Sequence, residues 1–330
     1  MILNRYEIFL KTAEIGNITK TAEILHYTQA GISHAIAALE KETGFSLLAR
    51  SASGVTLTEN GKRLLPYIQT LVNDQHGLSQ AIYDINETVA GTLRIATFTS
   101  VSTQWLPTII RKFQADYPLV EFDLLAGDYD EITERILSGR VDCGFLTAPV
   151  ADPLVFHLLY KDPMNVLLPE RHPLTRQNVL TLLEIKKEPL VLPTKGSDND
   201  IQAVLNSTRG KTNVRYVLND DLSVISMVSH GFGITIMPEL ILRNLNYSLE
   251  IRPIDPPQYR AIGIASMPLN RVSVLSKTFI QYLTDPSKIN FNEPCSRFHQ
   301  RSSQRTHQDP QLLCLSHREV CRKLFCYPSR

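Results

Sequence analysis

The chain has 330 residues, of which 43% are hydrophobic and 20% charged, and its 34 basic and 33 acidic side chains leave a formal net charge of +1. This length predicts about two domains, and the apolar fraction suffices for a buried core, which excludes a wholly disordered chain. The near-neutral balance excludes a polybasic tail protein without excluding a local DNA-binding surface. No apolar run approaches the roughly 18 residues of a membrane-spanning helix, and the charged N-terminus is unlike a signal peptide, so we expect a cytoplasmic protein.

The first 58 residues predict two short helices joined by a turn. Apolar side chains in residues 18–25 follow the i, i+4, i+7 spacing of a helix with one buried face. After the turn, Thr28 is a good N-cap for a second helix over about residues 29–42, and Gly44 suits its C-terminal end. Two helices connected in this way form a helix-turn-helix unit.

The second helix has two faces of different character. Ile32, Ile36 and Leu39 fall within one arc, which would pack on the domain core. The other arc is small, polar and uncharged until Lys41, so it would fit the major groove of DNA and offer hydrogen-bonding groups to bases or phosphates. We predict five DNA contacts on it, Thr28, Gln29, Ala30, Ser33 and His34. A polar solvent face is the alternative, which the preceding helix and turn disfavour.

Residues 45–58 place a Ser/Gly turn between apolar segments, as in a two-stranded wing. Arg50 at the base of this wing is predicted to reach a phosphate or the minor groove. The first 63 residues hold seven basic against six acidic side chains, a thin electrostatic footprint for DNA. We therefore expect affinity to depend on several subunits binding together.

Residues 59–89 predict one long amphipathic helix. Its apolar positions follow a 4-3-4-3 spacing that is typical of a coiled-coil seam, with one polar position at Gln75. We assign a dimer contact to six of them, Leu64, Ile68, Leu71, Leu78, Ile82 and Ile85. Packing of these side chains within one chain is the alternative. We favour the dimer because two DNA half-sites require two recognition helices. Pro66 should kink or locally open this helix.

Residues 90–290 alternate strand-like and helix-like segments. The β-α-β-α-β order indicates a parallel sheet with crossover helices, with strands at 92–98, 120–125 and 141–146. We divide this half into lobe 2, at about 162–267, and lobe 1, at about 90–161 and 268–290. Two crossings would make a hinge, so that a ligand in the cleft changes the lobe geometry.

The ligand site is expected beyond the C-terminal ends of the strands, where helix N-termini offer free N–H groups. We predict effector contacts there, at Thr99, Ser100, Ser102 and Thr147 in lobe 1 and at Thr194, Gly196 and Ser197 in lobe 2. Helix capping alone is the alternative for the three serines. Asp198 and Asp200 disfavour an anionic effector whereas Lys195 favours one, so the sign of the effector stays open.

Several motifs of the first 90 residues resemble, in order, the N-terminal part of LysR-type transcriptional regulators. The segments that carry the resemblance are 9–10, 13–25, 28–33, 39–40, Gly44, 47–50 and 57–61. It continues more loosely to about residue 285, where Gly231 to Pro238 resembles a glycine-containing helix-to-strand motif of the family. By position in the motifs, the resemblance implies that Arg50 corresponds to the wing of the family and that four residues correspond to its recognition-helix contacts, Thr28, Gln29, Ser33 and His34.

The resemblance implies an α/β protein in three parts. An all-α-rich winged helix-turn-helix would occupy residues 1–58, a dimerising linker helix residues 59–89, and a two-lobed α/β effector domain similar to type 2 periplasmic binding proteins residues 90–290. The resemblance implies a sequence-specific DNA-binding transcriptional regulator. It would be a homodimer or homotetramer, and a small molecule bound between the lobes would control its activity. RNA polymerase is a further candidate partner, and activation and repression both stay open.

Two other classes of function were weighed. A cytoplasmic small-ligand-binding protein without regulatory action would also explain the two lobes. An enzyme is not expected because the sequence contains no recognisable catalytic set, and we expect no metal and no cofactor other than the effector. Cys143 lies mid-strand in an apolar run, which predicts a buried inert thiol rather than a redox sensor.

Residues 291–330 differ in character from the rest of the chain. They mix Cys, His and Pro with seven basic and three acidic side chains, and no hydrophobic period persists. Their cysteine and histidine spacings match no zinc site. We expect a disordered tail with free thiols, either an interaction arm or, as we prefer, an addition foreign to the fold, for example from a shifted reading frame.

Overall fold

The computed structural model describes residues 5–51, 54–85, 88–194, 199–243 and 247–291. The predicted tail begins at residue 291, but Phe291 is buried against Trp105, so this boundary is one residue too early. Residues 292–330 of the predicted tail lie outside the described residues, as do the predicted contacts Gly196 and Ser197. No helix within the described ranges is long and apolar enough to cross a membrane.

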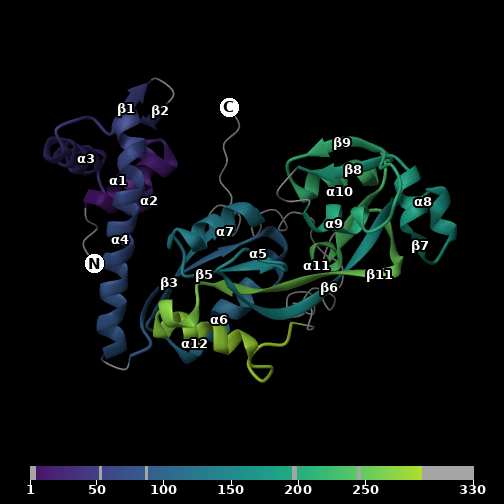
Figure 1. Cartoon of the computed structure of the whole chain (residues 1–330). Helices are drawn as coiled ribbons and strands as arrows, with labels where there is room; N and C mark the ends of the chain where they lie inside the picture. Colours follow the sequence, from purple (N-terminus) through teal and green to yellow (C-terminus); the bar gives the residue numbers. More distant parts are fainter. Residues whose placement is uncertain (1–4, 52–53, 86–87, 195–198, 244–246, 292–330) are drawn as a thin grey trace, which may run out of the picture. The chain divides into compact units, whose positions relative to one another are not determined.

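The N-terminal domain is a winged helix-turn-helix (Figure 1). Its elements are α1 (Arg5–Ile15), α2 (Ile18–Leu25), α3 (Gln29–Thr43), β1 (Leu48–Ser51) and β2 (Gly54–Leu57). The Thr28 side chain accepts a hydrogen bond from the Gly31 N–H at 3.0 Å, and Gly44 ends α3 in the left-handed conformation. The predicted N-cap, second helix and C-terminal glycine are therefore confirmed.

The core of this domain is built from the apolar arcs of its helices. Ile32, Ile36 and Leu39 of α3 are buried, together with Phe9 of α1. The Glu40 carboxylate accepts hydrogen bonds from the backbone N–H groups of residues 47–48, which fixes the start of the wing against α3. The wing strands β1 and β2 pair antiparallel, as the sequence predicts.

The linker helix α4 (Glu59–Ile85) runs unbroken through Pro66, so the predicted opening of the helix there does not occur. Pro66 is the eighth residue of α4, so its missing N–H removes one intrahelical hydrogen bond, to the carbonyl of Lys62, and the helix continues on both sides of this gap. A side chain at Gly61 would clash with the Leu47 carbonyl oxygen, so glycine allows the first turn of α4 to pack closely on the wing.

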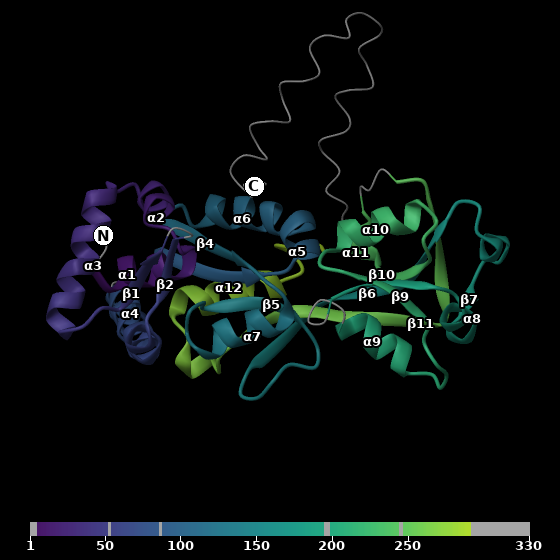
Figure 2. The ribbon, with the colours of Figure 1, turned by 90° about the horizontal axis from the view of Figure 1, so that it is seen from above.

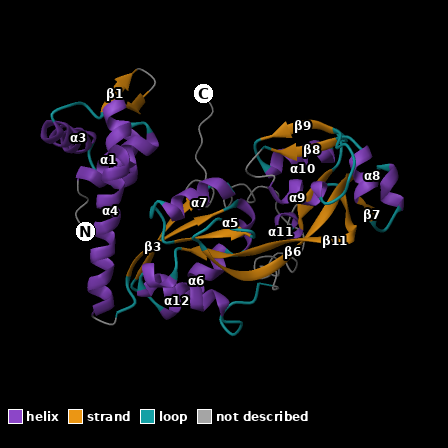
Figure 3. Ribbon diagram, viewed as in Figure 1, coloured by secondary structure: helices purple, strands orange, loops and turns teal. Residues whose placement is uncertain are grey.

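Lobe 1 of the C-terminal domain contains the predicted parallel strands. The strand β3 (Gly91–Thr97) pairs in parallel with β4 (Val120–Ala126) and with β5 (Cys143–Thr147). The helices of this lobe are α5 (Thr99–Gln104), α6 (Leu106–Asp116), α7 (Tyr129–Leu137) and α12 (Val274–Thr284). In Figure 3 the strands gather in the C-terminal half, whereas helices dominate the N-terminal domain. Cys143 is fully buried in β5, as expected.

Two long strands cross between the lobes, β6 (Val155–Pro169) and β11 (Leu249–Ser266), and they pair antiparallel (Figure 2). Their register shifts between Pro253 and Gln258 and again between Ile262 and Gly263. From Ile262 onward β11 pairs with β5 of lobe 1, so the chain returns to lobe 1 within this strand and earlier than the boundary at 268. One sheet therefore runs through both lobes, in the order β10-β6-β11-β5-β3-β4.

Lobe 2 surrounds the other end of these crossing strands. Its strands are β7 (Leu180–Thr181), β8 (Leu190–Pro193), β9 (Val214–Leu218) and β10 (Thr235–Pro238). Its helices are α8 (Leu182–Lys187), α9 (Asn199–Asn206), α10 (Asp221–Ser229) and α11 (Glu239–Leu242), with the short 3-10 turn η1 (Pro173–Arg176); a second such turn, η2 (Leu269–Arg271), precedes α12. The lobe buries its own apolar clusters, separate from the core of lobe 1.

Candidate functional site

The recognition face, defined as Thr28, Gln29, Ala30, Ser33 and His34, lies on the open side of α3. Four of these residues are exposed and Ser33 is half-buried, while the apolar arc of the same helix is buried in the domain core. The Thr28 hydroxyl also caps α3, which orients it at the N-terminal end of the helix. Arg50 is exposed on β1, where it pairs across the wing with Val55.

The linker helix exposes a line of large apolar side chains. Leu78 is 64% and Ile85 81% exposed, and Tyr67, which the sequence reasoning did not single out, is 74% exposed. Together with Leu71 and Ile82, which are also exposed, Leu78 and Ile85 form what we call the seam. Apolar surface of this extent along one helix is typical of an interaction site.

Two of the six predicted dimer contacts lie elsewhere. Ile68 is buried and Leu64 partly buried, and both pack in the core of the winged helix-turn-helix. They stand in the early turns of α4, next to α1 and the wing, where the same heptad spacing serves packing within one chain. Ile68 is therefore not available to a partner, and Leu64 is available only in part.

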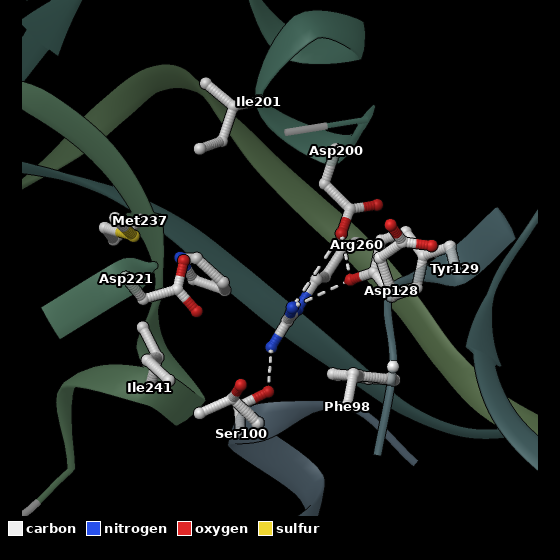
Figure 4. Close-up of a pocket in the computed structure, with 13 residues that line it drawn as sticks. Phe98, Ser100, Asp128, Tyr129, Asp200, Ile201, Asp221, Met237, Ile241 and Arg260 are labelled. Carbon is white, nitrogen blue, oxygen red and sulfur yellow. Dashed lines mark hydrogen bonds and ion pairs between the residues drawn. The ribbon is translucent and has the colours of Figure 1, made fainter. Parts of the chain in front are cut away.

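A cavity of about 60 Å³, which we call the cleft, lies where the two lobes and the crossing strands meet (Figure 4). Lobe 1 contributes the end of β3 and the starts of α5 and α7. Lobe 2 contributes the starts of α9 and α10 and the turn from β10 to α11. The lining residues are Phe98, Thr99, Ser100, Gly127, Asp128, Tyr129, Asp200, Ile201, Asp221, Met237, Pro238, Ile241 and Arg260.

Arg260 of the crossing strand β11 is the centre of the hydrogen-bond network in the cleft. Its Nε donates to Asp162 Oδ2 at 2.9 Å, and its Nη2 lies 2.7 Å from the same oxygen. Nη2 donates to Ser100 Oγ at 2.8 Å and Nη1 donates to Tyr129 Oη at 3.1 Å. Nη1 also lies 3.7 Å from the carboxylate of Asp200, so one side chain joins lobe 1, lobe 2 and both crossing strands.

Burial shifts the acidity of several groups in this network. It acts to lower the pKa of Arg260, but Tyr129 and the carboxylates of Asp162 and Asp200 outweigh it and raise this pKa, so the guanidinium stays charged. Burial raises the pKa of the Tyr129 hydroxyl, which therefore donates to Asp200 Oδ2 at 2.6 Å as a neutral group. Burial also raises the pKa of Asp221.

The structure brings only some of the predicted effector residues to the cleft. Thr99 and Ser100 line it, and Ser100 is not a simple cap because its hydroxyl accepts from Arg260. Ser102, Thr147 and Thr194 do not line the cleft. The Ser102 hydroxyl instead donates to the Thr99 carbonyl oxygen at 2.9 Å, as expected for a local helix-end contact.

Sequence reasoning missed four polar residues of the cleft, the charged Asp128, Asp221 and Arg260 and the neutral Tyr129. Asp128 and Asp221 had a usable signal, since each stands at the start of a helix that follows a strand. Arg260 had none, because it sits inside an 18-residue strand whose residues do not alternate cleanly between apolar and polar.

Comparison with known proteins assigns the chain to a family. The LysR substrate binding domain matches residues 86–286, and the bacterial regulatory helix-turn-helix of the lysR family matches residues 3–62. The chain therefore belongs to the LysR family of DNA-binding transcriptional regulators.

Relatives match over almost their full length. The chain is 28% identical to the HTH-type transcriptional regulator YvbU of Bacillus subtilis, over 85% of this chain and 97% of that protein. It is 30% identical to the transcriptional dual regulator GltC of Bacillus subtilis, over 82% of this chain and 92% of that protein. A full-length variant of OxyR from Pseudomonas aeruginosa has the same fold, with a TM-score of 0.61 and 21% identity over 86% of this chain and 93% of that one.

Proposed function

We propose that this regulator recognises its operator with the recognition face of α3, assembles through the seam of α4, and responds to a small molecule bound in the cleft. The observation that carries the proposal is the division of α3 into a buried apolar arc and an open polar arc. A helix that is anchored on one side and polar, small and uncharged on the other is suited to the major groove.

Assembly through the seam is supported by its exposure. Leu71, Leu78 and Ile85 are exposed to water in the single chain. Burying them would stabilise an assembly by roughly 25 cal/mol per Å² of apolar surface removed from water. Pairing two such helices would bury these side chains and bring two recognition faces to one operator. A homodimer is the smallest assembly that does this, and a homotetramer would be a pair of such dimers.

Response to a ligand is supported by where the cleft lies. Its walls come from both lobes, and Arg260 stands on a strand that belongs to both. A ligand that contacts both walls binds one lobe arrangement better than another, which is the requirement for shifting a conformational equilibrium. The matched substrate binding domain spans both lobes.

Contacts from lobe 1 offer a route toward the DNA-binding domain. Asn73 of α4 donates to the Ser138 carbonyl oxygen at 2.7 Å, and Arg140 pairs with Glu14 of α1 at 2.7 Å. The ring of His76 lies 2.9 Å from the Glu7 carboxylate. A change in lobe geometry would therefore act on α1 and α4 through polar contacts that can rearrange.

The test is a quantitative DNA-binding assay on the full chain. The chain should bind the DNA upstream of its own gene more tightly than unrelated DNA of equal length. The substitution Gln29→Ala should weaken this specific binding about tenfold or more and leave binding to unrelated DNA nearly unchanged. The matched control is Gln281→Ala, the same change at an exposed position of α12, which should leave both affinities unchanged.

Two results would contradict the proposal. Equal losses on specific and unrelated DNA would remove the base-contact role of Gln29. Absence of any sequence-specific binding by an intact dimer would instead favour the second candidate function, a small-ligand-binding protein without regulatory action.

A further inference from the structure

The cleft is unevenly charged. Three carboxylates line it, from Asp128, Asp200 and Asp221, against one guanidinium from Arg260. Behind Arg260, the carboxylate of Asp162 is completely buried and already neutralises that guanidinium. The described lining therefore carries negative charge without a matching cation.

Arg260 is poorly placed to receive an anion. Each of its three guanidinium nitrogens already donates to a group of the protein itself, Nε to Asp162, Nη1 to Tyr129 and Nη2 to Ser100, and Nη1 also lies 3.7 Å from Asp200. An incoming carboxylate or phosphate would have to displace these partners. It would also approach the carboxylates of Asp200 and Asp221, and like charges in a poorly hydrated space repel strongly.

The carboxylate of Asp221 can still accept hydrogen bonds from a ligand. It stands in the first turn of α10 and lines the cleft, and no described residue donates a hydrogen bond to its side chain or pairs with it. Figure 4 shows its carboxylate directed into the cleft, on the opposite side of Arg260 from Tyr129. A mostly buried carboxylate without a partner is costly, because it has lost water and gained no donor. The raised pKa of Asp221, caused mainly by burial, agrees with this geometry.

The surroundings of Arg260 indicate that the cleft can hold an organic cation. The guanidinium carbon lies 5.3 Å from the centroid of the Phe98 ring, whose edge contact with Tyr129 has a centroid distance of 5.1 Å. Carboxylates, hydroxyls and an aromatic face together form the environment in which proteins bind ammonium and guanidinium groups.

We propose that the effector is a small organic cation, an amine whose ammonium head binds between Asp200 and Asp221. This proposal rests on the proposed role of the cleft as the effector site. An organic cation is favoured over a metal ion because the described carboxylates form no group of three that could hold one. The space of about 60 Å³ admits an ammonium head, so the remainder of the ligand would lie toward the mouth of the cleft or open the lobes.

The ammonium head would act on the lobe arrangement through Asp200. This carboxylate now accepts from Tyr129 of lobe 1 and lies 3.7 Å from Arg260. A second cation beside it would compete with the guanidinium for the same oxygen atoms. The contact between α9 and the crossing strand would then change when ligand binds.

The experiment compares two four-carbon probes of opposite sign on the full chain without DNA. We expect 1,4-diaminobutane to raise the Tm and to give a measurable Kd by calorimetry, and succinate to do neither. Asp221→Asn and Asp200→Asn should each weaken diamine binding about tenfold or more, the loss of one charge-assisted hydrogen bond. Asp130→Asn, at an exposed position of α7 that does not line the cleft, is the matched control and should bind as the unmodified chain does.

Each other outcome overturns the proposal in a distinguishable way. Binding of succinate but not of diamine, weakened by Ser100→Ala, leaves the cleft as the effector site and reverses the sign of its ligand. Diamine binding that is equal in all variants places the diamine outside the cleft. Binding of neither probe removes the cation proposal, while the DNA-binding assay still decides on the regulator itself.

Discussion

The recognition face and the cleft, the two surfaces to which we assign functions, are built in opposite ways. The first comes from one helix and its N-cap, is mostly exposed and contains no Asp, Glu, Lys or Arg. The second comes from helices and strands of both lobes around one buried guanidinium, with charges facing one another at short distances. We therefore expect substitutions on α3 to change DNA binding without changing stability, and substitutions in the cleft to change both.

The largest effect is expected from Arg260→Ala. Arg260 is 6% and Asp162 0% exposed, so the variant leaves a buried carboxylate without its partner. Loss of one partner of a buried pair costs about 3–5 kcal/mol in the free energy of unfolding. Urea unfolding followed by circular dichroism measures this, with Arg271→Ala at an exposed position as control. A loss below about 1 kcal/mol would contradict the buried network, since that is the range of exposed ion pairs.

The next effect is expected at the seam. Leu78→Glu places a charge on a surface that we propose to be buried between two copies of α4. The dimer Kd should rise by more than tenfold, since burying an unpaired charge costs about 2 kcal/mol or more. Analytical ultracentrifugation over a concentration series measures it, with Leu137→Glu at an exposed position of α7 as the control. An unchanged Kd would place the dimer contact elsewhere.

Ser33→Ala tests the separability of function on α3. Specific DNA binding should weaken by about 1–3 kcal/mol, the discrimination typical of one base contact. The free energy of unfolding should change by less than about 0.5 kcal/mol, as is usual at positions without a buried partner. Fluorescence anisotropy and urea unfolding on the same preparation measure the two quantities. A stability loss as large as the binding loss would break the contrast with the cleft.

The smallest effect is expected from Asp221→Asn without ligand, and it has the opposite sign. Burial raises the pKa of Asp221 in the folded chain, Arg260 acts to lower it, and the neighbouring Asp220 acts to raise it further. The carboxylates of Asp128 and Asp200 line the same cleft. A group whose folded pKa is raised contributes stability at low pH that is lost as pH rises through the folded value. The variant should therefore have a slightly higher Tm at pH 7, a gain that disappears below the unfolded pKa of about 3.9. A lower Tm at pH 7 would indicate that this carboxylate has a stabilising partner.

The two surfaces also differ in how far the sequence predicts them. On α3, the period of Ile32, Ile36 and Leu39 defines the buried side, and the opposite side follows by geometry alone. Ser100 is predictable for a similar reason, since it follows the end of a strand. Arg260 and Asp162 lie 98 residues apart along the chain, and no local period relates them. The heptad spacing of α4 also gives a wrong prediction at Ile68. The early turns of the helix pack on the winged helix-turn-helix and the later turns are proposed to pack on a partner helix, and one apolar stripe serves both contacts.

The two register shifts in β11 have a mechanical consequence. Paired strands are weakest where their ladder is interrupted, and the shifts fall on both sides of the segment that holds Arg260. Bending between the lobes should therefore concentrate at this segment, which would act as the hinge. A ligand that disturbs the partners of Arg260 would act close to this hinge. A displacement of a fraction of an ångström there would then produce a much larger displacement at the far end of the lobe.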